Sequence, residues 1–384
     1  MRGRQFDGLL FALSLGLSAV GIVLIYSATR GTPFQDFPAR QVIWVTCGLV
    51  AMALIILPSY HLLLRWEPFL YGLNLLLLTM VLFIGAEGGG SSRWYDLRLF
   101  RVQPSEFAKV VLVISLARLL AGVVRSDKRL SPKGLLLSFG YVVLPMALVF
   151  KQPDLGTSLT FLFLWFVMAW MAGARWWHLG IALVLLGAGA VGAWHSDILH
   201  DYQKKRVLIL LDPFQEPLGA GYHIIQSEIA LASGGWKGMG FLQGAQTQLH
   251  FVPHQHTDAI FTALGEEWGY LGCLTILGLY GLLLWRGTQA VLRAPDLEGQ
   301  LIAAGLTAIF GFHVFVNIGV VTGLLPFTGI PLPFLSYGGS HLLTNMLALG
   351  LLQNIRLREE ASFFQAQDRS IAAHIEIATP PRVL

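Results

Sequence analysis

Asp258 is the ionisable residue of this 384-residue chain whose position most strongly suggests catalysis. It follows His256 and Thr257 and immediately precedes a long apolar run that begins at Ala259. An aspartate at such a loop-to-helix junction often caps the helix. A carboxylate at the wet edge of a cleft can instead act as a general base, and cations from other loops could stabilise a phosphate leaving group. The residue types around Asp258 leave both interpretations open.

A second set of ionisable residues lies close to the ends of other apolar runs. Glu106 and Lys109 are three positions apart, so they share one helix face. They form either an ion pair that only orders the helix or the wall of a cavity. Asp154 lies between two apolar runs, and it belongs to the same candidate charge network. For Glu266 and Glu267 we favour a structural role, because buried carboxylates need partners on neighbouring elements.

Two patterns suggest other kinds of site only weakly. His254 and His256 are separated by one residue, and no third ligand has a suitable spacing, so a metal site is the less favoured alternative. The glycines between Gly234 and Gly240 lack the Gly-Lys-Ser/Thr sequence of a phosphate loop. We expect these glycines to allow tight turns rather than to bind a nucleotide.

The composition indicates a protein whose main solvent is lipid. Hydrophobic residues make up 55% of the chain and charged residues only 12%, and the mean hydropathy is +0.63. The net charge of +4 does not indicate nucleic-acid binding, because the basic residues lie in short runs between apolar segments. Cys47 and Cys273 fall inside apolar runs, which indicates neither a disulfide nor a metal site. The first apolar run, from Leu9 to Tyr26, has no small-residue cleavage site, so we expect a retained helix rather than a signal peptide.

The apolar runs predict an all-α integral membrane protein with about ten transmembrane helices, each of roughly 20 residues. The alternation typical of barrel strands is absent from the sequence. The predicted spans are Gly8–Ala28, Gln41–Leu57, Phe69–Gly85, Pro104–Val124, Gly134–Phe150, Leu155–Ala172, Trp177–Trp194, Ala259–Leu284, Gln300–Thr322 and His341–Arg356.

The basic residues of the short connectors favour a cytoplasmic location for both ends of the chain. On the other side we expect three functional segments, Glu87–Gln103, His195–Asp258 and Leu325–Ser340, since long connections often carry function. The domain organisation that follows is a transmembrane domain over residues 1–358 and a cytoplasmic C-terminal tail over residues 359–384. The extracytoplasmic loop between the seventh and eighth spans covers residues 195–258.

Motifs along almost the whole chain resemble the SEDS family of cell-wall polymerases (shape, elongation, division and sporulation). The resemblance is greater to the rod-shape branch, RodA, than to the division branch, FtsW. The motifs are Arg93-Trp94, Gln103-Pro-Ser-Glu-Phe-Ala-Lys109, Lys151-Gln-Pro-Asp-Leu-Gly156, Tyr202-Gln203, Arg206, Leu211-Asp-Pro213, Gly221-Tyr222, Gln226-Ser227, Ser233-Gly-Gly235, Gly244-Ala-Gln-Thr-Gln-Leu249, His256-Thr-Asp258, Gly265-Glu-Glu267, Thr328-Gly-Ile-Pro-Leu-Pro-Phe-Leu-Ser-Tyr-Gly-Gly-Ser340 and Asn345.

The chain departs from the family pattern on both sides of His256-Thr-Asp258. The family commonly has Leu-Pro-Glu before this motif and Phe after it, whereas this chain has Val252-Pro253-His254 and Ala259. The missing acid is expected to change local pKa values or a loop contact. Asp258 itself is retained, so we do not expect the departure to remove activity.

The resemblance implies an inverting peptidoglycan glycosyltransferase that polymerises lipid II during cell elongation and maintenance of cell shape. Asp258 would take the proton from the 4-hydroxyl of the acceptor sugar, whose oxygen would attack C1 of the donor as undecaprenyl diphosphate leaves. Glu106, Lys109 and Asp154 match positions that the family places around its central cavity. The candidate substrate-binding residues are Arg93, Trp94, Arg98, Arg101, Lys204, Lys205, Arg206, His256, Thr257, Ser336 and Ser340.

The resemblance also implies a setting and partners. We expect a multi-pass protein of the bacterial cytoplasmic membrane with its active site on the extracytoplasmic side. Its expected partners are a class B penicillin-binding protein, lipid II and other proteins of the elongation complex, and no nucleic acid. No cofactor follows from the sequence, although a divalent cation such as Mg²⁺ stays open.

Two alternatives belong to other functional classes. A lipid II flippase would also need many helices and buried charges, but a transporter should keep its ionisable groups near the midplane of the bilayer. The strongest candidates here lie near the outer interface. A non-catalytic scaffold of the elongation complex is the other alternative, in which Asp258 would be only a helix cap.

Overall fold

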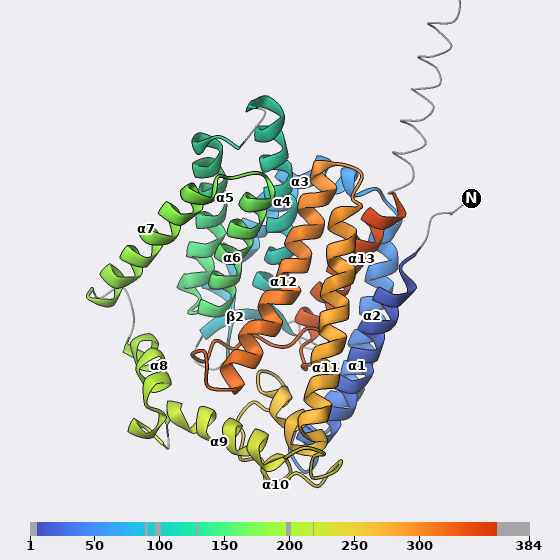
Figure 1. Ribbon diagram of the computed structural model, residues 1–384, viewed down its shortest axis with the longest axis vertical. Helices are drawn as coiled ribbons and strands as arrows, with labels where there is room; N and C mark the ends of the chain where they lie inside the picture. Colours follow the sequence, from blue (N-terminus) through green and yellow to red (C-terminus); the bar gives the residue numbers. More distant parts are fainter. Residues whose placement is uncertain are drawn as a thin grey trace, which may run out of the picture.

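The computed structural model describes residues 6–88, 91–96, 101–127, 130–196, 201–217 and 219–358, and it shows a bundle of long helices (Figure 1). Shorter helices and three short strands lie toward one end of this bundle. The helices are α1 Gly8–Thr29, α2 Phe37–Ile56, α3 Tyr60–Ile84, α4 Pro104–Asp127, α5 Pro132–Lys151, α6 Leu155–Met171, α7 Trp176–Trp194, α8 Asp201–Leu211, η1 Pro213–Gln215, α9 Ala220–Ser233, α10 Ala245–Gln248, α11 Ile260–Leu292, α12 Leu297–Val321 and α13 Gly339–Leu357. The strands are β1 Ala86–Gly88, β2 Ser91–Asp96 and β3 Arg101–Val102.

The predicted all-α fold is confirmed, and each predicted span coincides with one long helix. Within the described part of the chain, eight helices are long and apolar enough to cross a membrane, namely α1 to α5, α7, α11 and α12. Helix α6 is apolar but has only 17 residues. Helix α13 has 19 residues, and several of its buried side chains are polar, so its composition alone does not mark it as a span. The number of helices that cross the bilayer therefore stays a prediction.

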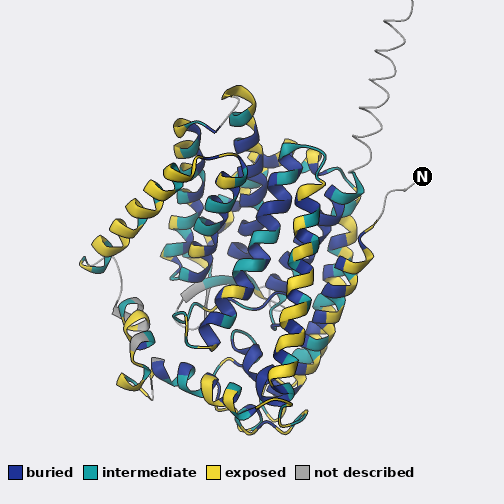
Figure 2. Cartoon of the chain, viewed as in Figure 1, coloured by how far each residue is buried: buried dark blue, intermediate teal, exposed yellow. Residues whose placement is uncertain are grey.

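The burial of each helix explains its composition. Helices α4, α12 and α13 lie at the centre of the bundle, and most of their residues are buried (Figure 2). The polar residues of α13, such as Asn345 and Gln353, are therefore surrounded by protein rather than by lipid. Helix α7 is the opposite case, because none of its residues is buried and it slants away from the other helices. Its apolar residues suit direct contact with lipid.

The first of the three predicted functional segments contains a small antiparallel sheet in the order β1-β2-β3. Ala86 pairs with Trp94, and Tyr95 pairs with Val102. The sequence predicted only a long connection here. The sheet packs against α3 and α4, so it closes the end of the bundle where α4 begins.

The second segment is also more ordered than the predicted loop. Helices α8, α9 and α10 and the short helix η1 follow one another along the lower edge of Figure 1. Helix α9 packs against α11, whereas α8 packs against α9 and η1. The described part of residues 195–258 therefore contains four short helices, joined by turns, toward one end of the bundle.

Two prolines inside helices each free a backbone carbonyl, and a neighbouring helix supplies the missing donor. Pro68 cannot donate to the carbonyl of Leu64, and Arg118 Nη1 donates to that oxygen at 3.0 Å. Pro145 likewise frees the carbonyl of Tyr141, which accepts a hydrogen bond of 2.7 Å from the Tyr71 hydroxyl. Backbone groups at membrane depth have no water to bond with, so these side chains fix α3 against α4 and α5.

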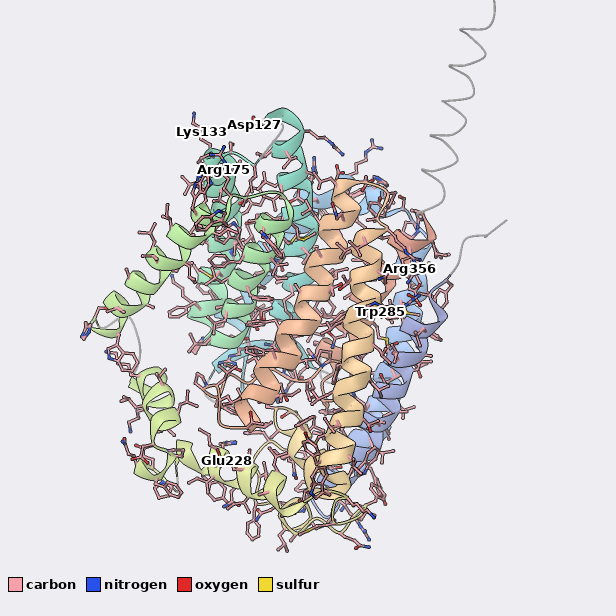
Figure 3. The ribbon with its side chains drawn as sticks, in the orientation of Figure 1. Asp127, Lys133, Arg175, Glu228, Trp285 and Arg356 are labelled. Carbon is pink, nitrogen blue, oxygen red and sulfur yellow. The ribbon has the colours of Figure 1, made fainter. Side chains whose placement is uncertain are left out.

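The end of the bundle opposite the short helices contains the start of α1 and the end of α13, and we refer to it as the chain-end side. Asp7, just before α1, accepts hydrogen bonds from Arg286 at 2.9 Å and from Arg356. Arg125 pairs with Glu298 at the same end. Figure 3 shows Arg356 and Asp127 toward this end of the molecule and Glu228 at the other. Asp7 is 3% exposed, so the first helix is held to the last by buried charge pairs.

Candidate active site

Asp258 lies in the loop just before α11, at the end of the bundle far from the chain ends. The helix begins at Ile260, and its capping position is Ala259, which makes no side-chain capping bond. The predicted loop-to-helix junction is therefore confirmed, with Asp258 one residue before the capping position. The half-buried Asp258 carboxylate faces Gly329, where a Cβ atom would lie 3.6 Å from Asp258 Oδ2. The site thus forms where the loop before α11 meets the loop before α13.

Hydrogen bonds hold these two loops together on both sides of Asp258. The side-chain amide of Asn317 donates to the carbonyl of Asp258 at 2.7 Å and to that of Ile330 at 2.8 Å. The Ser336 hydroxyl donates to the carbonyl of Thr257 at 2.6 Å. The backbone N–H of Tyr337 donates to the carbonyl of His256 at 2.9 Å. These bonds fix the backbone on both sides of Asp258, and so they position its side chain relative to the loop before α13.

The glycines between Gly234 and Gly240 pack against α11 where this helix is broken at Gly269. Gly269 has φ of +68° within α11, and a Cβ atom there would lie 2.2 Å from the backbone nitrogen of Gly238. Only glycine fits such a close approach with positive φ. Gly235, Gly238 and Gly240 also have positive φ, so the predicted turning role of these glycines is confirmed.

Glu106 and Lys109 form a buried cluster with two histidines. Lys109 Nζ lies 2.9 Å from both carboxylate oxygens of Glu106. His341 Nδ1 lies 2.9 Å from Glu106 Oε2, and His313 Nε2 lies 3.3 Å from Lys109 Nζ. The rings of His313 and His341 stack with 5.3 Å between their centroids. All four residues are at most 5% exposed, so the predicted ion pair is part of a larger polar network inside the bundle.

Helix α12 connects this cluster with the loop of Asp258. His313 and Asn317 are four positions apart, so they lie on the same face of α12 and about 6 Å apart along its axis. His313 contacts Lys109, and Asn317 contacts the backbone of Asp258. The Glu106–Lys109 pair therefore lies about one helical turn farther into the bundle than the loop that contains Asp258.

His256 lies in an aromatic cluster at the same loop. Its ring centroid is 5.3 Å from that of Phe34 and 5.3 Å from that of Phe37, and Phe37 stacks on Tyr337. Burial, together with the nearby His254, lowers the pKa of His256 to about 4. The ring is therefore neutral at physiological pH.

His254 occupies the position where the family commonly has an acid. Its ring lies parallel to that of His223 on α9, with 6.0 Å between the centroids. Its carbonyl accepts a hydrogen bond from the Thr257 hydroxyl at 3.1 Å. The departure from the family pattern thus replaces a negative charge with a ring contact between the loop and α9.

The hydrogen bonds of Asp154 that the structure describes are not to members of the Glu106 cluster. Its carboxylate caps α6, accepting from the Thr157 N–H at 3.1 Å and from the Thr157 hydroxyl at 3.0 Å. Gln103 Nε2 also donates to Asp154 Oδ2 at 3.2 Å. The backbone N–H of Gln103 in turn donates to the Ser340 hydroxyl at 3.0 Å. Asp154 and Ser340 therefore both hold the segment that leads into α4.

The predicted cationic residues are spread over two regions. The guanidinium of Arg93 donates to the carbonyls of Gln152 and Pro153. Arg101 lies 3.4 Å from Asp96 on the neighbouring strand. Both arginines belong to the small sheet, as does the half-buried Trp94.

The remaining predicted cations lie on α8. Lys204 donates to the carbonyl of Ser196 at 3.1 Å, and Lys205 pairs with Glu216 at 2.9 Å. Arg206 belongs to the same helix, but its side chain is not described, and Arg98 lies outside the described residues. The sequence predicted one set of diphosphate contacts, whereas the structure separates these residues between the sheet and α8.

Glu266 has the structural role that the sequence indicated. Its two carboxylate oxygens accept from the backbone N–H groups of Gln246 at 2.7 Å and Thr247 at 2.8 Å. The Thr247 hydroxyl donates to the same carboxylate at 2.6 Å. Glu267 accepts a hydrogen bond from the Ser27 hydroxyl on α1. These two carboxylates attach α11 to α10 and to α1.

Three residues of the site were not selected by sequence reasoning. Asn317 supports the loop of Asp258, and His313 and His341 complete the Glu106 cluster. His341 directly follows the family motif that ends at Ser340, so it could have been considered. The four-residue spacing of His313 and Asn317 was the available signal for a polar face on α12.

The described residues contain no group of three or more His, Cys, Asp or Glu side chains placed to hold a metal ion. An apolar cavity of about 330 Å³ lies between α3, α4 and the small sheet. Its lining includes Leu73, Tyr95 and Phe107. This end of the bundle therefore offers both polar groups and an apolar cavity.

Comparison with known proteins gives matches over nearly the whole chain. Residues 7–361 match the FtsW/RodA/SpoVE family model, which is described as a cell cycle protein. The chain is 40% identical to the peptidoglycan glycosyltransferase MrdB of Escherichia coli K12, covering 91% of this chain and 93% of that protein. It is 38% identical to the stage V sporulation protein E of Bacillus subtilis, covering 91% and 96% of the two chains.

Solved structures agree with these matches. A chain from a peptidoglycan synthase complex, described as coordinating polymerization and crosslinking, has a TM-score of 0.79 at 35% identity, covering 92% of this chain and 98% of that one. The rod shape determining protein RodA of Thermus thermophilus has a TM-score of 0.69 at 30% identity, again covering 92% and 98%. The similarity therefore includes the fold as well as the sequence.

Proposed function

We propose that this chain, which belongs to the FtsW/RodA/SpoVE family, is a peptidoglycan glycosyltransferase that polymerises lipid II into glycan strands during cell elongation. The observation that carries the activity is the 40% identity with a peptidoglycan glycosyltransferase over 91% of the chain. The similarity to the structures of RodA supports a role in cell shape. The match extends through the loops that surround Asp258, since it covers residues 7–361.

In this proposal Asp258 is the general base. The carboxylate takes the proton from the sugar 4-hydroxyl of the acceptor, and that oxygen forms a bond to C1 of the donor sugar. The bond from C1 to the diphosphate oxygen breaks, and undecaprenyl diphosphate leaves with the electron pair. Direct displacement inverts C1 and needs no covalent intermediate. Support comes from the half-buried position of Asp258 between two braced loops.

The surrounding groups have supporting roles in the same proposal. The diphosphate of the donor requires cations, and Arg101 on the exposed edge of the sheet and Lys204 and Lys205 on α8 are the candidates. Arg93 binds two backbone carbonyls, which favours a role in holding the sheet to the start of α6. The apolar cavity between α3, α4 and the sheet has the chemistry to receive part of an isoprenoid chain.

The proposed setting is the bacterial cytoplasmic membrane, with the chain ends in the cytoplasm and Asp258 on the extracytoplasmic side. Arginines and lysines near the chain-end side, such as Lys133 and Arg175, support this orientation (Figure 3). The proposed partner is a class B penicillin-binding protein, which would crosslink the new strands. The similarity to a chain of a peptidoglycan synthase complex supports such an assembly.

The test is polymerisation of labelled lipid II by the purified chain together with its partner. We expect glycan product from the wild type, and a decrease of about 10²- to 10⁴-fold in the rate for Asp258→Asn, because this change removes a general base. Asp36→Asn is the matched control, since Asp36 is an exposed carboxylate whose ion pair within the described residues is with Arg40, four positions away. The control variant should keep its rate.

The outcomes separate the proposal from its two rivals. Full activity of a well-folded Asp258→Asn protein would remove Asp258 from the mechanism. Transfer of lipid II across liposomes without polymer would support a flippase. If neither polymer nor transfer occurs while the partner still binds, a scaffold becomes the better description.

A further inference from the structure

A second cavity lies between α3, α4 and α5, in the half of the bundle nearer the chain ends. Its volume is about 400 Å³, and we name it the α3–α5 pocket. Unlike the lining of the apolar cavity at the other end, its lining combines apolar side chains such as Leu119 and Val123 with polar and charged ones. The polar and charged ones include Glu67, Ser115, Arg118, Ser126 and Tyr141.

Two polar atoms in the α3–α5 pocket are buried without a hydrogen-bond partner among the described residues. They are Glu67 Oε1 and Ser115 Oγ, from residues that are 5% and 1% exposed. A buried carboxylate oxygen without a donor is costly, and the cost is greater at membrane depth. Glu67 Oε1 therefore needs a donor, and the Ser115 hydroxyl needs a partner that can be a donor or an acceptor.

Arg118 supplies a positive charge beside these acceptors. Its Nη1 donates to the carbonyl that Pro68 leaves free, that of Leu64, and lies 3.4 Å from Glu67 Oε2. The bonds that Arg118 makes within the described chain all use Nη1, so its other N–H groups are available to a ligand. The side chain is 45% exposed, so the guanidinium lies at the mouth of the pocket.

Exposed tryptophans indicate the depth of the pocket in the membrane. Trp66 and Trp285 are both half-exposed, and such tryptophans concentrate at the interface between lipid and water. Figure 3 labels Trp285 just below Arg356, between the level of Asp127 and that of Glu228. Glu67 directly follows Trp66 and lies about 10 Å from the start of α3. From the position of Glu67 near the start of α3, next to the exposed Trp66, we infer that the pocket opens near the level of lipid headgroups.

We propose that the α3–α5 pocket binds the headgroup of an ethanolamine phospholipid. The ammonium donates to Glu67 Oε1 and Ser115 Oγ, and the phosphate accepts from the free N–H groups of Arg118. This ligand has a cation that can donate to the buried Glu67 carboxylate and an anion that can accept from the Arg118 guanidinium at the mouth of the pocket. The binding does not depend on glycosyltransferase activity, so the two proposals can fail separately.

The choice among phospholipids follows from the donors that each headgroup carries. Phosphatidylcholine has the phosphate and a positive charge but no N–H group, so it cannot bond to Glu67. Phosphatidylglycerol has the phosphate and hydroxyl donors, but it adds a net negative charge beside the Glu67 carboxylate. Both should bind more weakly than phosphatidylethanolamine.

The experiment measures binding of palmitoyl-oleoyl phosphatidylethanolamine, phosphatidylcholine and phosphatidylglycerol to the full-length wild-type protein by native mass spectrometry. We expect the first bound ethanolamine lipid to have a Kd about tenfold lower than that of the choline lipid, the effect of one charged hydrogen bond. Glu67→Gln should remove the preference for the ethanolamine lipid over the choline lipid. Arg118→Gln should weaken the binding of all three lipids.

A steric variant tests the pocket without changing its charges. Gly122 lines the pocket, and a Cβ atom there would meet no atom within 4 Å, so Gly122→Leu should fold and fill the space. Gly187→Leu on the exposed helix α7 is its matched control, since that position is equally open.

Arg65→Gln is the control for Arg118→Gln, since it removes an exposed arginine on the same helix as Glu67. Melting temperatures verify that each variant is folded.

Three results would overturn the proposal. Equal binding of ethanolamine and choline lipids to the wild type would exclude donation by the ammonium. Tighter binding of phosphatidylglycerol would mean that the pocket recognises an anionic lipid through Arg118 alone. Wild-type binding by both Glu67→Gln and Gly122→Leu would place the lipid elsewhere and leave only water as the partner of the buried acceptors.

Discussion

At the scale of single residues, the site depends on buried polar groups whose partners come from distant parts of the chain. Asn317 donates to the carbonyls of Asp258 and Ile330, which belong to two different loops. The Glu106 carboxylate lies 2.9 Å from both Lys109 Nζ and His341 Nδ1, and Lys109 is nearly fully buried. Removing one member of such a network leaves the others unpaired at a cost of about 1–3 kcal/mol for each uncharged group.

His256 should make stability depend on pH. Its pKa is lowered to about 4 in the folded protein, below the usual value of 6.5 that applies when the chain is unfolded. The unfolded chain therefore binds the proton first, and stability decreases as the pH falls from about 6.5 toward 4. Between pH 6.5 and pH 5 this one group contributes up to about 2 kcal/mol of that decrease.

The measurement compares melting temperatures at pH 7.5 and pH 5 in wild type and His256→Phe. Phenylalanine keeps a ring beside Phe34 and Phe37 but has no proton to bind. The acid-induced decrease in melting temperature should be smaller in the variant. Equal decreases in the two proteins would assign the pH dependence to groups other than His256.

At the scale of elements, α12 has the central position in the site. One of its faces contacts both the Glu106 cluster and the loop of Asp258, so a displacement of this helix changes both. Helix α11 is held differently. Its break at Gly269 lets the glycine run over residues 234–240 bond to its backbone, as in the bond from the Met239 N–H to the Glu266 carbonyl at 2.9 Å.

Asn317→Leu tests the connection that α12 makes between the two loops. The change removes the hydrogen bonds to the carbonyls of Asp258 and Ile330, so we expect a stability loss of about 2–4 kcal/mol and a strong decrease in polymerisation. Chemical unfolding and the lipid II assay measure the two effects.

Asn345→Leu is the control for this substitution. Asn345 is also a buried asparagine in a central helix, but its side-chain nitrogen has no partner among the described residues. Its replacement should cost much less stability. If the two variants lose the same stability, the bonds of Asn317 are not what holds the loops.

At the scale of the whole molecule, the two ends of the bundle differ in chemistry. One end has the short helices, the sheet and the two loops around Asp258. At the other end, buried ion pairs of Asp7 with Arg286 and Arg356 hold the start of α1 to α11 and to the end of α13. This polarity suits a protein whose reaction occurs on one side of a membrane.

Cysteine labelling tests the proposed orientation. In a Cys47→Ser background we introduce Phe214→Cys in η1 or Lys133→Cys at the start of α5, both at exposed positions. A membrane-impermeant maleimide applied to spheroplasts should label the cysteine at position 214 and leave the one at position 133 unlabelled. Permeabilised membranes should show labelling of both. The reverse pattern in intact spheroplasts would invert the proposed topology.

The sequence by itself determined the membrane class, the positions of the long helices and the family. These features depend on local composition and on motifs in chain order, since a helix in lipid satisfies its own backbone groups. The aspartate at the start of α11 and the Glu106–Lys109 pair could be selected for the same reason, because both lie at recognisable positions of helices. The sheet near β2 and the helices between α7 and α11 were less predictable, since their amphipathic patterns are short.

Only the tertiary structure decided which groups meet. Asn317 and Asp258 are 59 positions apart, and His341 and Glu106 are 235 apart, so no local pattern reports these contacts. The tertiary structure also separates Asp154, which caps α6, from the Glu106 cluster, although the sequence placed these residues in one candidate network. It also brought Glu67, Ser115 and Arg118 around one pocket, because the packing of helices determines which polar faces lie inside the bundle and which of their groups remain without a partner.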